Sequence, residues 1–124
     1  MNKKFIVKES RKFNEIIASG KQFKNHFFVV FYKNNDQSYS RYGISVGKKV
    51  GKAVERNYLK RRVRAILREQ QKCYDFSIDC IIIVRKSCLS SDYEIMKKNL
   101  LKLLTMIKEK KDEEKSSFML ACAV

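Results

Sequence analysis

The sequence predicts one mixed α/β domain, with elements in the order helix, two strands, helix, strand and helix. The length of 124 residues and the hydrophobic content of 44% suit a single compact core. Runs rich in aromatic and β-branched residues have the length of strands, and apolar residues at helical spacing lie before, between and after them. This alternation indicates a sheet packed against helices.

The first predicted element is a short helix over residues 10–20. Ser10 is a favourable N-cap, and Gly20 is a favourable helix stop. Between them, Phe13, Ile16 and Ile17 recur at helical spacing and give the helix one apolar face.

Two strands are predicted after this helix. The run 27–32 consists of aromatic and β-branched residues, which is typical of a strand with two apolar faces. After a polar turn at 34–38, apolar residues alternate with small or charged ones over 41–46, as in a half-buried strand. Because only the turn separates these strands, we expect them to pair as a hairpin.

The second half of the chain predicts a basic helix, a central strand and a last helix. Apolar residues at helical spacing over 53–71 share one face, and cations occupy the adjoining flank. The continuous apolar run within 79–85 is expected of a central strand that is covered on both faces. Ser91 and Glu94 have the spacing of a capping box, which would start the last helix.

The chain beyond Ile107 has a different character. Helical spacing of apolar residues ends there, so we expect a single domain over 1–107 and a charged, then apolar, tail over 108–124. Residues 108–117 hold four Lys, four acids and no apolar side chain, which is typical of a solvated helix extension or tail. Residues 118–124 are apolar and are expected to pack back on the domain as a strap or to bind a partner.

The composition points to a polyanionic partner. A formal charge of +15 destabilises the compact state by self-repulsion unless a polyanion shares the surface. Nucleic acid is therefore the first partner to consider, and an anionic membrane is the second. No apolar stretch is long enough for a signal peptide or a membrane span, so we expect a cytoplasmic protein without a membrane partner.

The same composition disfavours catalysis by this chain alone. His26 is the only histidine, and this disfavours a metal cluster or an acid/base pair built from histidines. The cysteines lack C-x-x-C spacing, which disfavours a zinc ribbon and indicates reduced, mostly buried thiols. They are Cys73, Cys80, Cys88 and Cys122.

Nearly half of the net charge lies in one stretch of the chain. Residues 48–64 hold eight Lys or Arg side chains against Glu55 alone. Solvated helix faces usually alternate the two signs at four-residue spacing, whereas this face repeats one sign, which predicts a phosphate-binding surface. The loop at 47–52 is one residue too short for a P-loop and is followed by Ala53 in place of Ser or Thr, which excludes nucleotide binding there.

Aromatic residues gather in the first half of the chain, and most of them are expected in the core. A minority on an open face would stack on unpaired bases, which suits single-stranded RNA better than the grooves of duplex DNA. The cluster consists of Phe23, Phe27, Phe28, Phe31, Tyr32, Tyr39 and Tyr42.

The stretch VGKAVERNYLKRRVR, residues 50–64, resembles the signature of the protein subunit of bacterial ribonuclease P. Its fixed positions include Ala53, the Arg-Asn pair at 56–57, the basic pair at 60–61 and the closing Arg64, with apolar residues between them. The preceding RYGISVGKK resembles the second strand and loop of this family, and the likeness extends from Ser10 to Ile107.

The resemblance implies a two-layer α/β sandwich in the order helix, strands, helix, strand, helix, with a left-handed β-α-β crossover that is contrary to the usual hand. It also implies a protein component of a ribonucleoprotein endoribonuclease that removes the 5′ leader of precursor tRNA. In this family the catalyst is the RNA subunit, and Mg²⁺ is expected to be held mainly by that RNA and the substrate. No catalytic residue is expected on the protein.

The resemblance assigns two binding surfaces to this chain. The cleft between the first helix and the sheet is expected to hold the single-stranded leader through Phe13, Ile17 and Phe31. The basic helix and its loop are expected to contact the catalytic RNA. The residues carried over for this contact are Lys48, Lys49, Lys52, Arg56, Asn57, Lys60, Arg61 and Arg64. Two departures are Tyr58, where the family often has a basic residue, and Ile17, where it often has an aromatic one.

Two other functions stay open at this point. A nuclease made of protein alone would need clustered carboxylates for a metal, and only Asp75 with Asp79, or Asp92 with Glu94, come near. A non-catalytic binder of ribosomal or other structured RNA would use the same basic surface.

Overall fold

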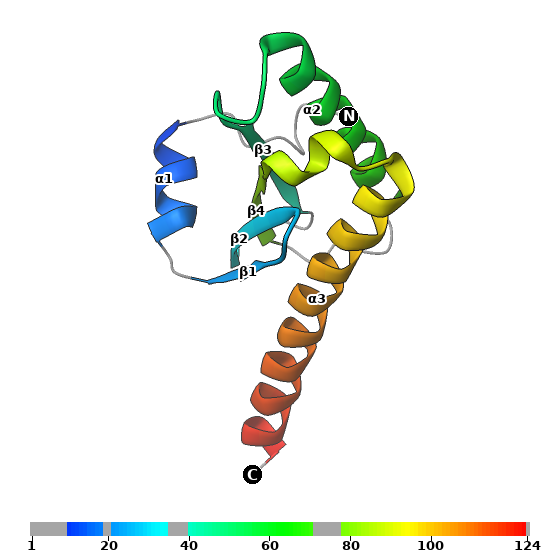
Figure 1. The fold of residues 1–124 in the computed structure, drawn as a ribbon. Helices are drawn as coiled ribbons and strands as arrows, with labels where there is room; N and C mark the ends of the chain where they lie inside the picture. Colours follow the sequence, from blue (N-terminus) through cyan, green and yellow to red (C-terminus); the bar gives the residue numbers. More distant parts are fainter. Residues whose placement is uncertain (1–9, 19–20, 35–39, 71–77, 124) are drawn as a thin grey trace.

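Four strands form one sheet in the order β1-β2-β4-β3, and helices lie on both of its faces (Figure 1). The computed structural model describes the backbone of residues 10–18, 21–34, 40–70 and 78–123, and the side chains of residues 14–18, 21–34, 40–69 and 78–110. In chain order the elements are α1 (Ser10–Ala18), β1 (Gln22–Lys24), β2 (Phe28–Asn34), β3 (Arg41–Val46), α2 (Ala53–Gln70), β4 (Ile78–Val84), the 3-10 helix η2 (Lys86–Ser90) and α3 (Tyr93–Ala123).

The pairing of the strands corrects the expected hairpin. β2 pairs with β4 in antiparallel register, with Phe28 opposite Val84, and β3 pairs with β4 in parallel, with Val46 opposite Val84. The prediction that β2 and β3 pair with each other is wrong because β4 lies between them. β4 is apolar on both faces, so only a central position buries all of it, and this outweighs the short connection between β2 and β3.

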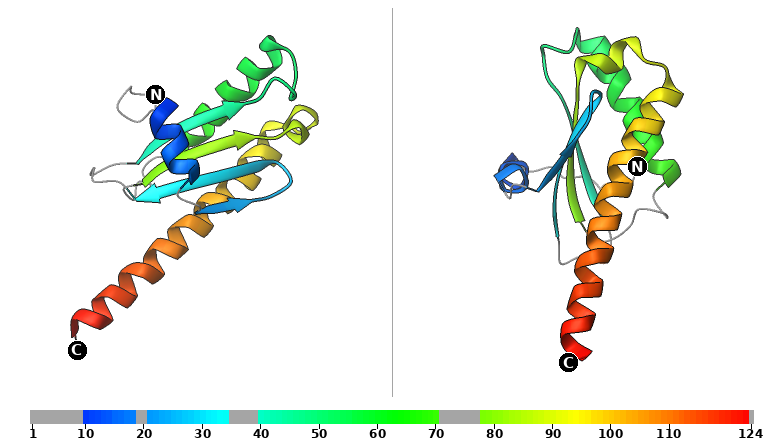
Figure 2. Two further views of the ribbon diagram at one scale, coloured as in Figure 1. Left: turned by 90° about the vertical axis from the view of Figure 1, so that its left-hand side faces the viewer. Right: turned by 60° about the horizontal axis from the view of Figure 1, so that its bottom comes forward.

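The connection from β3 through α2 to β4 is left-handed. Viewed from the α1 side, β3 lies above β4, both strands point to the right, and α2 lies behind the sheet (Figure 2, left). A right-handed crossover would place the second strand above the first in this view. The unusual hand that the family resemblance implies is therefore present in this chain.

The main core lies between the sheet and the α2–α3 layer. Alternate residues of β2, namely Phe28, Val30 and Tyr32, face this core, as the two-residue period of a strand requires. Leu59 and Leu104 are among the residues with which α2 and α3 cover the same face. The predicted two-layer sandwich is confirmed for the sheet and these helices.

A second, smaller cluster lies on the opposite face of the sheet, under α1. Ile16 of α1 and Ile81 of β4 are buried against each other, and Phe31 and Ile83 pack beside them. Figure 2 shows α1 lying across this face without covering all of it. The two faces of the sheet are therefore unequal, since one is sealed by two helices and the other is only partly covered.

The start of α3 differs in detail from the predicted capping box. The backbone N–H of Ile95 donates to Asp92 Oδ1 at 2.9 Å, so Asp92 caps the helix. Ser91, the residue that follows η2, instead donates its Oγ hydrogen to the carbonyl of Ser87 at 2.9 Å. The prediction of Ser91 as the cap is wrong by one position, because its hydroxyl is used by the preceding turn.

The backbone beyond Ile107 is a continuation of the last helix, which is one of the two alternatives predicted for 108–117. α3 continues to Ala123 and leads away from the sheet, rather than folding back on it as a strap (Figure 1). The side chains of 111–123 lie outside the described residues, so the other expectation, that the apolar end binds a partner, stays a prediction.

Cys80 and Cys88 are the two cysteines whose side chains the structure describes, and both are free and buried as predicted. Burial raises the pKa of the Cys80 thiol, and the neighbouring Asp79 carboxylate adds to this effect. Burial likewise raises the pKa of Cys88 to about 11. Both thiols therefore stay protonated near neutral pH and act as small apolar side chains. Cys73 and the side chain of Cys122 lie outside the described residues.

Candidate nucleic-acid interface

The predicted basic flank of α2 is present as one continuous surface. Arg56, Lys60 and Arg64 follow each other at four-residue spacing, so they lie one above another along the helix. Asn57 and Arg61 lie beside this row, and they are exposed, as is Arg64. Like charges at this spacing repel one another, so the row costs stability until an anion neutralises it.

The side chain of Arg56 is held closest to the protein. It is half-buried, and its Nε is buried without a hydrogen-bond partner among the described residues. A buried N–H that has no acceptor costs free energy, and a guanidinium offers several further N–H groups to an incoming oxygen.

The loop before α2 presents three more cations. A turn is closed by the Val50 N–H donating to the Gly47 carbonyl at 3.0 Å, and Lys48, Lys49 and Lys52 are exposed around it.

Glu55 fixes the junction between this loop and α2. Its Oε1 accepts from the Lys52 backbone N–H at 3.0 Å. A Cβ at Gly51 would lie 3.0 Å from the same oxygen, which is too close without a shift of the Glu55 side chain. Glycine at this position therefore permits the cap, and the one acid of the stretch organises the loop instead of neutralising it.

Arg62 belongs to the same basic stretch but points elsewhere. Its Nη1 donates to the Ser91 carbonyl at 3.1 Å and lies 3.6 Å from Met96 Sδ. Its guanidinium also lies over the ring of Tyr58 at 4.4 Å from the centroid. Arg62 therefore ties α2 to the start of α3, and its charge type alone could not distinguish this role from RNA contact.

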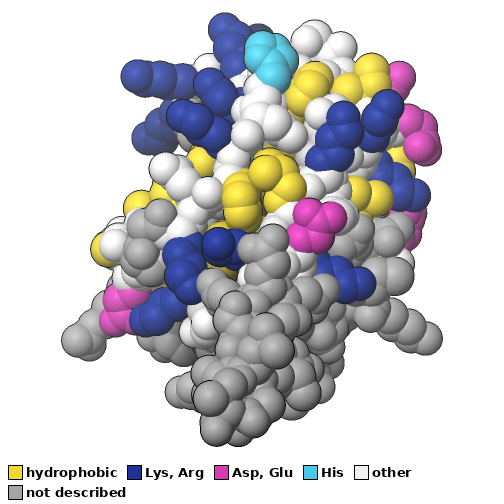
Figure 3. Space-filling view, turned by 90° about the horizontal axis from the view of Figure 1, so that it is seen from below, with side chains coloured by type: hydrophobic (Ala, Val, Ile, Leu, Met, Phe, Trp, Pro, Cys, Tyr) yellow, Lys and Arg dark blue, Asp and Glu magenta, His cyan; other side chains and the backbone are white. Residues whose placement is uncertain are grey.

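The structure adds cations that the sequence analysis did not assign. Val46, Val84 and Phe28 are aligned across three strands, so the loop before α2, Arg85 and the β1–β2 turn share one end of the sheet. Exposed basic side chains and the histidine gather at this end, and Figure 3 shows Lys and Arg crowded beside the histidine. The added cations are Lys24, Arg85 and Lys86, and the histidine beside them is His26.

Hydrogen bonds hold this end together. Arg85 Nη1 donates to the Asn25 carbonyl at 3.0 Å, and the Arg85 backbone N–H donates to the Phe27 carbonyl at 3.0 Å. Ser87 Oγ and His26 Nε2 share a hydrogen bond of 2.9 Å. The sequence signal was the Arg-Lys pair directly after a buried strand, but only the strand order places that pair beside the loop at 47–52.

The predicted leader residues lie at α1 and the face of the sheet beneath it. Phe31 is half-buried and packs against the Ile16–Ile81 pair. Ile17, the next residue on α1, is 39% exposed. Apolar surface is thus available beside a partly covered sheet face. The side chain of Phe13 lies outside the described residues, so its assignment stays a prediction.

The carboxylates considered for a protein nuclease have other uses. Arg41 binds Asp79 through two hydrogen bonds of 2.8 and 2.7 Å, and Asp92 caps α3. Within the described residues, no three His, Cys, Asp or Glu side chains are grouped so that they could hold a metal. Asp75 lies outside the described residues.

The Arg41–Asp79 pair is expected to contribute to stability instead. The two side chains are only 18% and 11% exposed, and Asp79→Ala would leave the guanidinium without its carboxylate. We expect the free energy of unfolding in urea to fall by about 1.5–3 kcal/mol, the usual contribution of hydrogen bonds to charged groups. Arg41→Ala should cost a similar amount, and the double variant little more than either. Additive losses in this cycle would contradict the direct pairing.

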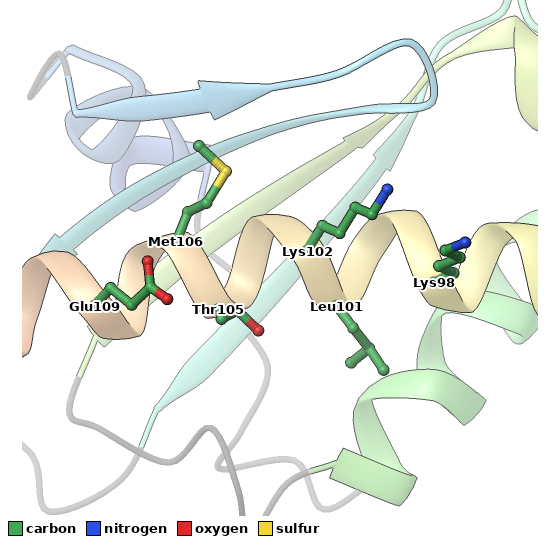
Figure 4. A pocket seen from close by; sticks show the side chains of 6 residues that line it. All are labelled: Lys98, Leu101, Lys102, Thr105, Met106 and Glu109. Atoms are coloured by element: carbon green, nitrogen blue, oxygen red, sulfur yellow. The ribbon is translucent and has the colours of Figure 1, made fainter.

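A hollow on α3 is lined by none of the residues predicted to contact RNA. It has a volume of about 480 Å³ and is lined by side chains of one helix that diverge from one another (Figure 4). The lining residues are Lys98, Leu101, Lys102, Thr105, Met106 and Glu109.

Among the described helices, none combines the length and the apolar character that crossing a membrane requires.

Sequence comparisons relate this chain to one protein family. The family model described as Ribonuclease P matches residues 1–108. A ribonuclease P protein component from Mycoplasma mycoides subsp. mycoides is 49% identical over 109 residues, which cover 87% of this chain and 100% of the relative.

Solved structures give the same result. A mutant of the Staphylococcus aureus RNase P protein matches with a TM-score of 0.80 and 31% identity, over 86% of this chain and 90% of that one. The RNase P protein from Thermotoga maritima matches with a TM-score of 0.74 and 37% identity, over 79% of this chain and 93% of that one. This chain therefore belongs to the ribonuclease P protein family, the protein subunits of a ribonucleoprotein endoribonuclease.

Proposed function

We propose that this chain binds the catalytic RNA subunit of ribonuclease P and the 5′ leader of precursor tRNA, and so assists removal of the leader to give the mature 5′ end. The observation that carries the proposal is the row of Arg56, Lys60 and Arg64, which has a single sign of charge and continues into the lysines of the loop. Nothing in the main core requires such a row, and a bound polyanion would relieve its self-repulsion.

The chemistry of this surface suits RNA phosphates. Arginine presents a planar set of N–H donors to phosphate oxygens, and lysine supplies a compact charge. Each neutralised phosphate releases counterions, so the logarithm of the association constant falls by roughly 0.7–0.9 per contact for each decade of salt. We assign this contact to Lys48, Lys49, Lys52, Arg56, Asn57, Lys60, Arg61 and Arg64, with Lys24, Arg85 and Lys86 extending it at the end of the sheet.

The leader is proposed to lie on the α1 side of the sheet. Phe31 and the exposed Ile17 offer apolar surface to unpaired bases there, and Phe13 is the third residue that the family resemblance assigns. The two RNA surfaces of the protein are thereby distinct, because the basic flank of α2 belongs to the layer on the other face of the sheet.

Catalysis is assigned to the RNA partner. The described residues hold no side-chain cluster that fits a metal, so we derive no step through a metal held by this chain. We propose that the Mg²⁺ required for hydrolysis is held mainly by the RNA subunit and the substrate, and that the complex works in the cytoplasm.

Competition binding tests this proposal against a general binder of structured RNA. Labelled catalytic RNA subunit should bind the purified chain and should be displaced by unlabelled RNA subunit at a concentration at least tenfold below that needed with ribosomal RNA fragments. Both titrations should be run at several salt concentrations, because affinities without salt dependence cannot be compared. Equal displacement by both RNAs would favour the general RNA binder.

A further inference from the structure

An aromatic ring on α2 is fixed in place beside the basic flank. Tyr58 is 50% exposed, and the guanidinium of Arg62 lies over its ring at 4.4 Å from the centroid. Arg62 is itself held by the Ser91 carbonyl at 3.1 Å, at the start of α3. The ring is thus braced from one side by a cation that is anchored to a second helix.

The position of this ring on the helix is informative. Arg61 follows Tyr58 by three residues and lies on the basic flank, so ring and flank are neighbours on the helix surface. A tyrosine that serves only the core would be buried like Tyr32 and Tyr42, which are each 4% exposed. Tyr58 instead presents its open surface next to side chains that suit phosphates.

We propose that Tyr58, braced by Arg62, is a stacking platform for an unpaired base of the RNA partner. The inference rests on the proposed RNA binding and names the kind of nucleotide that this part of the surface takes. Every base has a π-face, so stacking needs an unpaired base but no particular sequence. The brace reduces the side-chain freedom that is lost on binding, and the cation polarises the ring from the side that the base does not occupy.

The charges around the ring favour a base over an apolar protein partner. Arg61 and Arg62 flank Tyr58, and burying these cations against an apolar surface would cost free energy without a compensating anion. An unpaired nucleotide supplies both a flat ring for Tyr58 and a phosphate for Arg61.

Affinity for the RNA subunit and its salt dependence separate stacking from charge. Tyr58→Leu should weaken binding by about 5- to 100-fold while the slope of affinity against salt stays as in the wild type, because no phosphate contact is lost. Tyr58→Phe keeps the ring and should restore affinity to within about twofold. Arg56→Ala removes a phosphate contact instead of a stacking contact, so it should lower the slope of affinity against salt by about one. Thermal unfolding of each variant checks that α2 is intact.

A fluorescent ring gives a direct reading of the contact. The chain has no tryptophan, so Tyr58→Trp introduces a single reporter whose emission should be quenched when the RNA subunit binds. Met106→Trp, on an exposed part of α3, is the matched control and should keep its emission.

The outcomes distinguish the platform from the proposed function. Wild-type affinity of Tyr58→Leu together with unquenched Tyr58→Trp would overturn the platform and leave the proposed function standing. A wild-type protein that does not prefer the RNA subunit would overturn both.

Discussion

Replacing Arg56, Lys60 and Arg64 together by alanine is expected to weaken binding of the catalytic RNA by roughly 100-fold at about 0.15 M salt. Three lost phosphate contacts, each worth about 0.7–0.9 in slope, account for this loss and should flatten the dependence of affinity on salt by about 2–3. The stability of α2 should be retained, because alanine favours helices and the change removes repulsion between like charges. Filter binding across a salt series, with thermal unfolding alongside, measures both effects.

The matched control removes the same net charge elsewhere. Lys102, Lys108 and Lys110 are exposed on α3 and are not among the residues assigned to the RNA contact, and their replacement by alanine lowers the net charge by the same amount. This variant should retain nearly the wild-type slope. If both triple variants lost affinity equally, binding would follow the overall charge of the protein, and the assignment to the α2 flank would be wrong.

Phe31→Leu is expected to reduce the preference of the holoenzyme for precursor over mature tRNA by about 5- to 100-fold. Loss of stacking with one leader base accounts for an effect of this size. Leucine preserves the apolar contact with Ile16 and Ile81, so the fold should lose less than about 1.5 kcal/mol of stability. The measurement is the ratio of the two dissociation constants for the complex assembled with the RNA subunit.

Phe28→Leu is the control for this second variant. Phe28 lies on the same strand but faces the main core, where it is fully buried. Its replacement should lower the unfolding temperature and leave the ratio of the two dissociation constants unchanged. A Phe31→Leu protein that loses stability without any change in this ratio would show that Phe31 is a packing residue only.

The sequence could predict elements whose signal is local and periodic. The helical spacing over 53–71 and the apolar run within 79–85 correspond to α2 and the central strand β4. β1 was missed because its three residues, Gln-Phe-Lys, are too few to show a period. The hairpin was wrong for a different reason. Its turn is a local signal, whereas the insertion of β4 depends on which strand gains most from burial on both faces.

The candidate site divides in the same way. Periodicity was sufficient to place Arg56, Lys60 and Arg64 on one flank, because four-residue spacing fixes their relation on any helix. It could not show that Arg62 binds the carbonyl of Ser91, since that contact joins segments 29 residues apart. The sequence likewise could not assign Arg85 to this surface, because only the strand order places it beside the loop at 47–52.

Cleavage of precursor tRNA by the reconstituted complex tests the central claim most directly. The account predicts that the purified chain alone does not cleave. It also predicts that, at physiological Mg²⁺, the chain restores removal of the 5′ leader by its cognate RNA subunit, which is slow without the protein. Leader removal by the protein free of RNA, or a reconstituted complex no faster than RNA alone, would contradict the account.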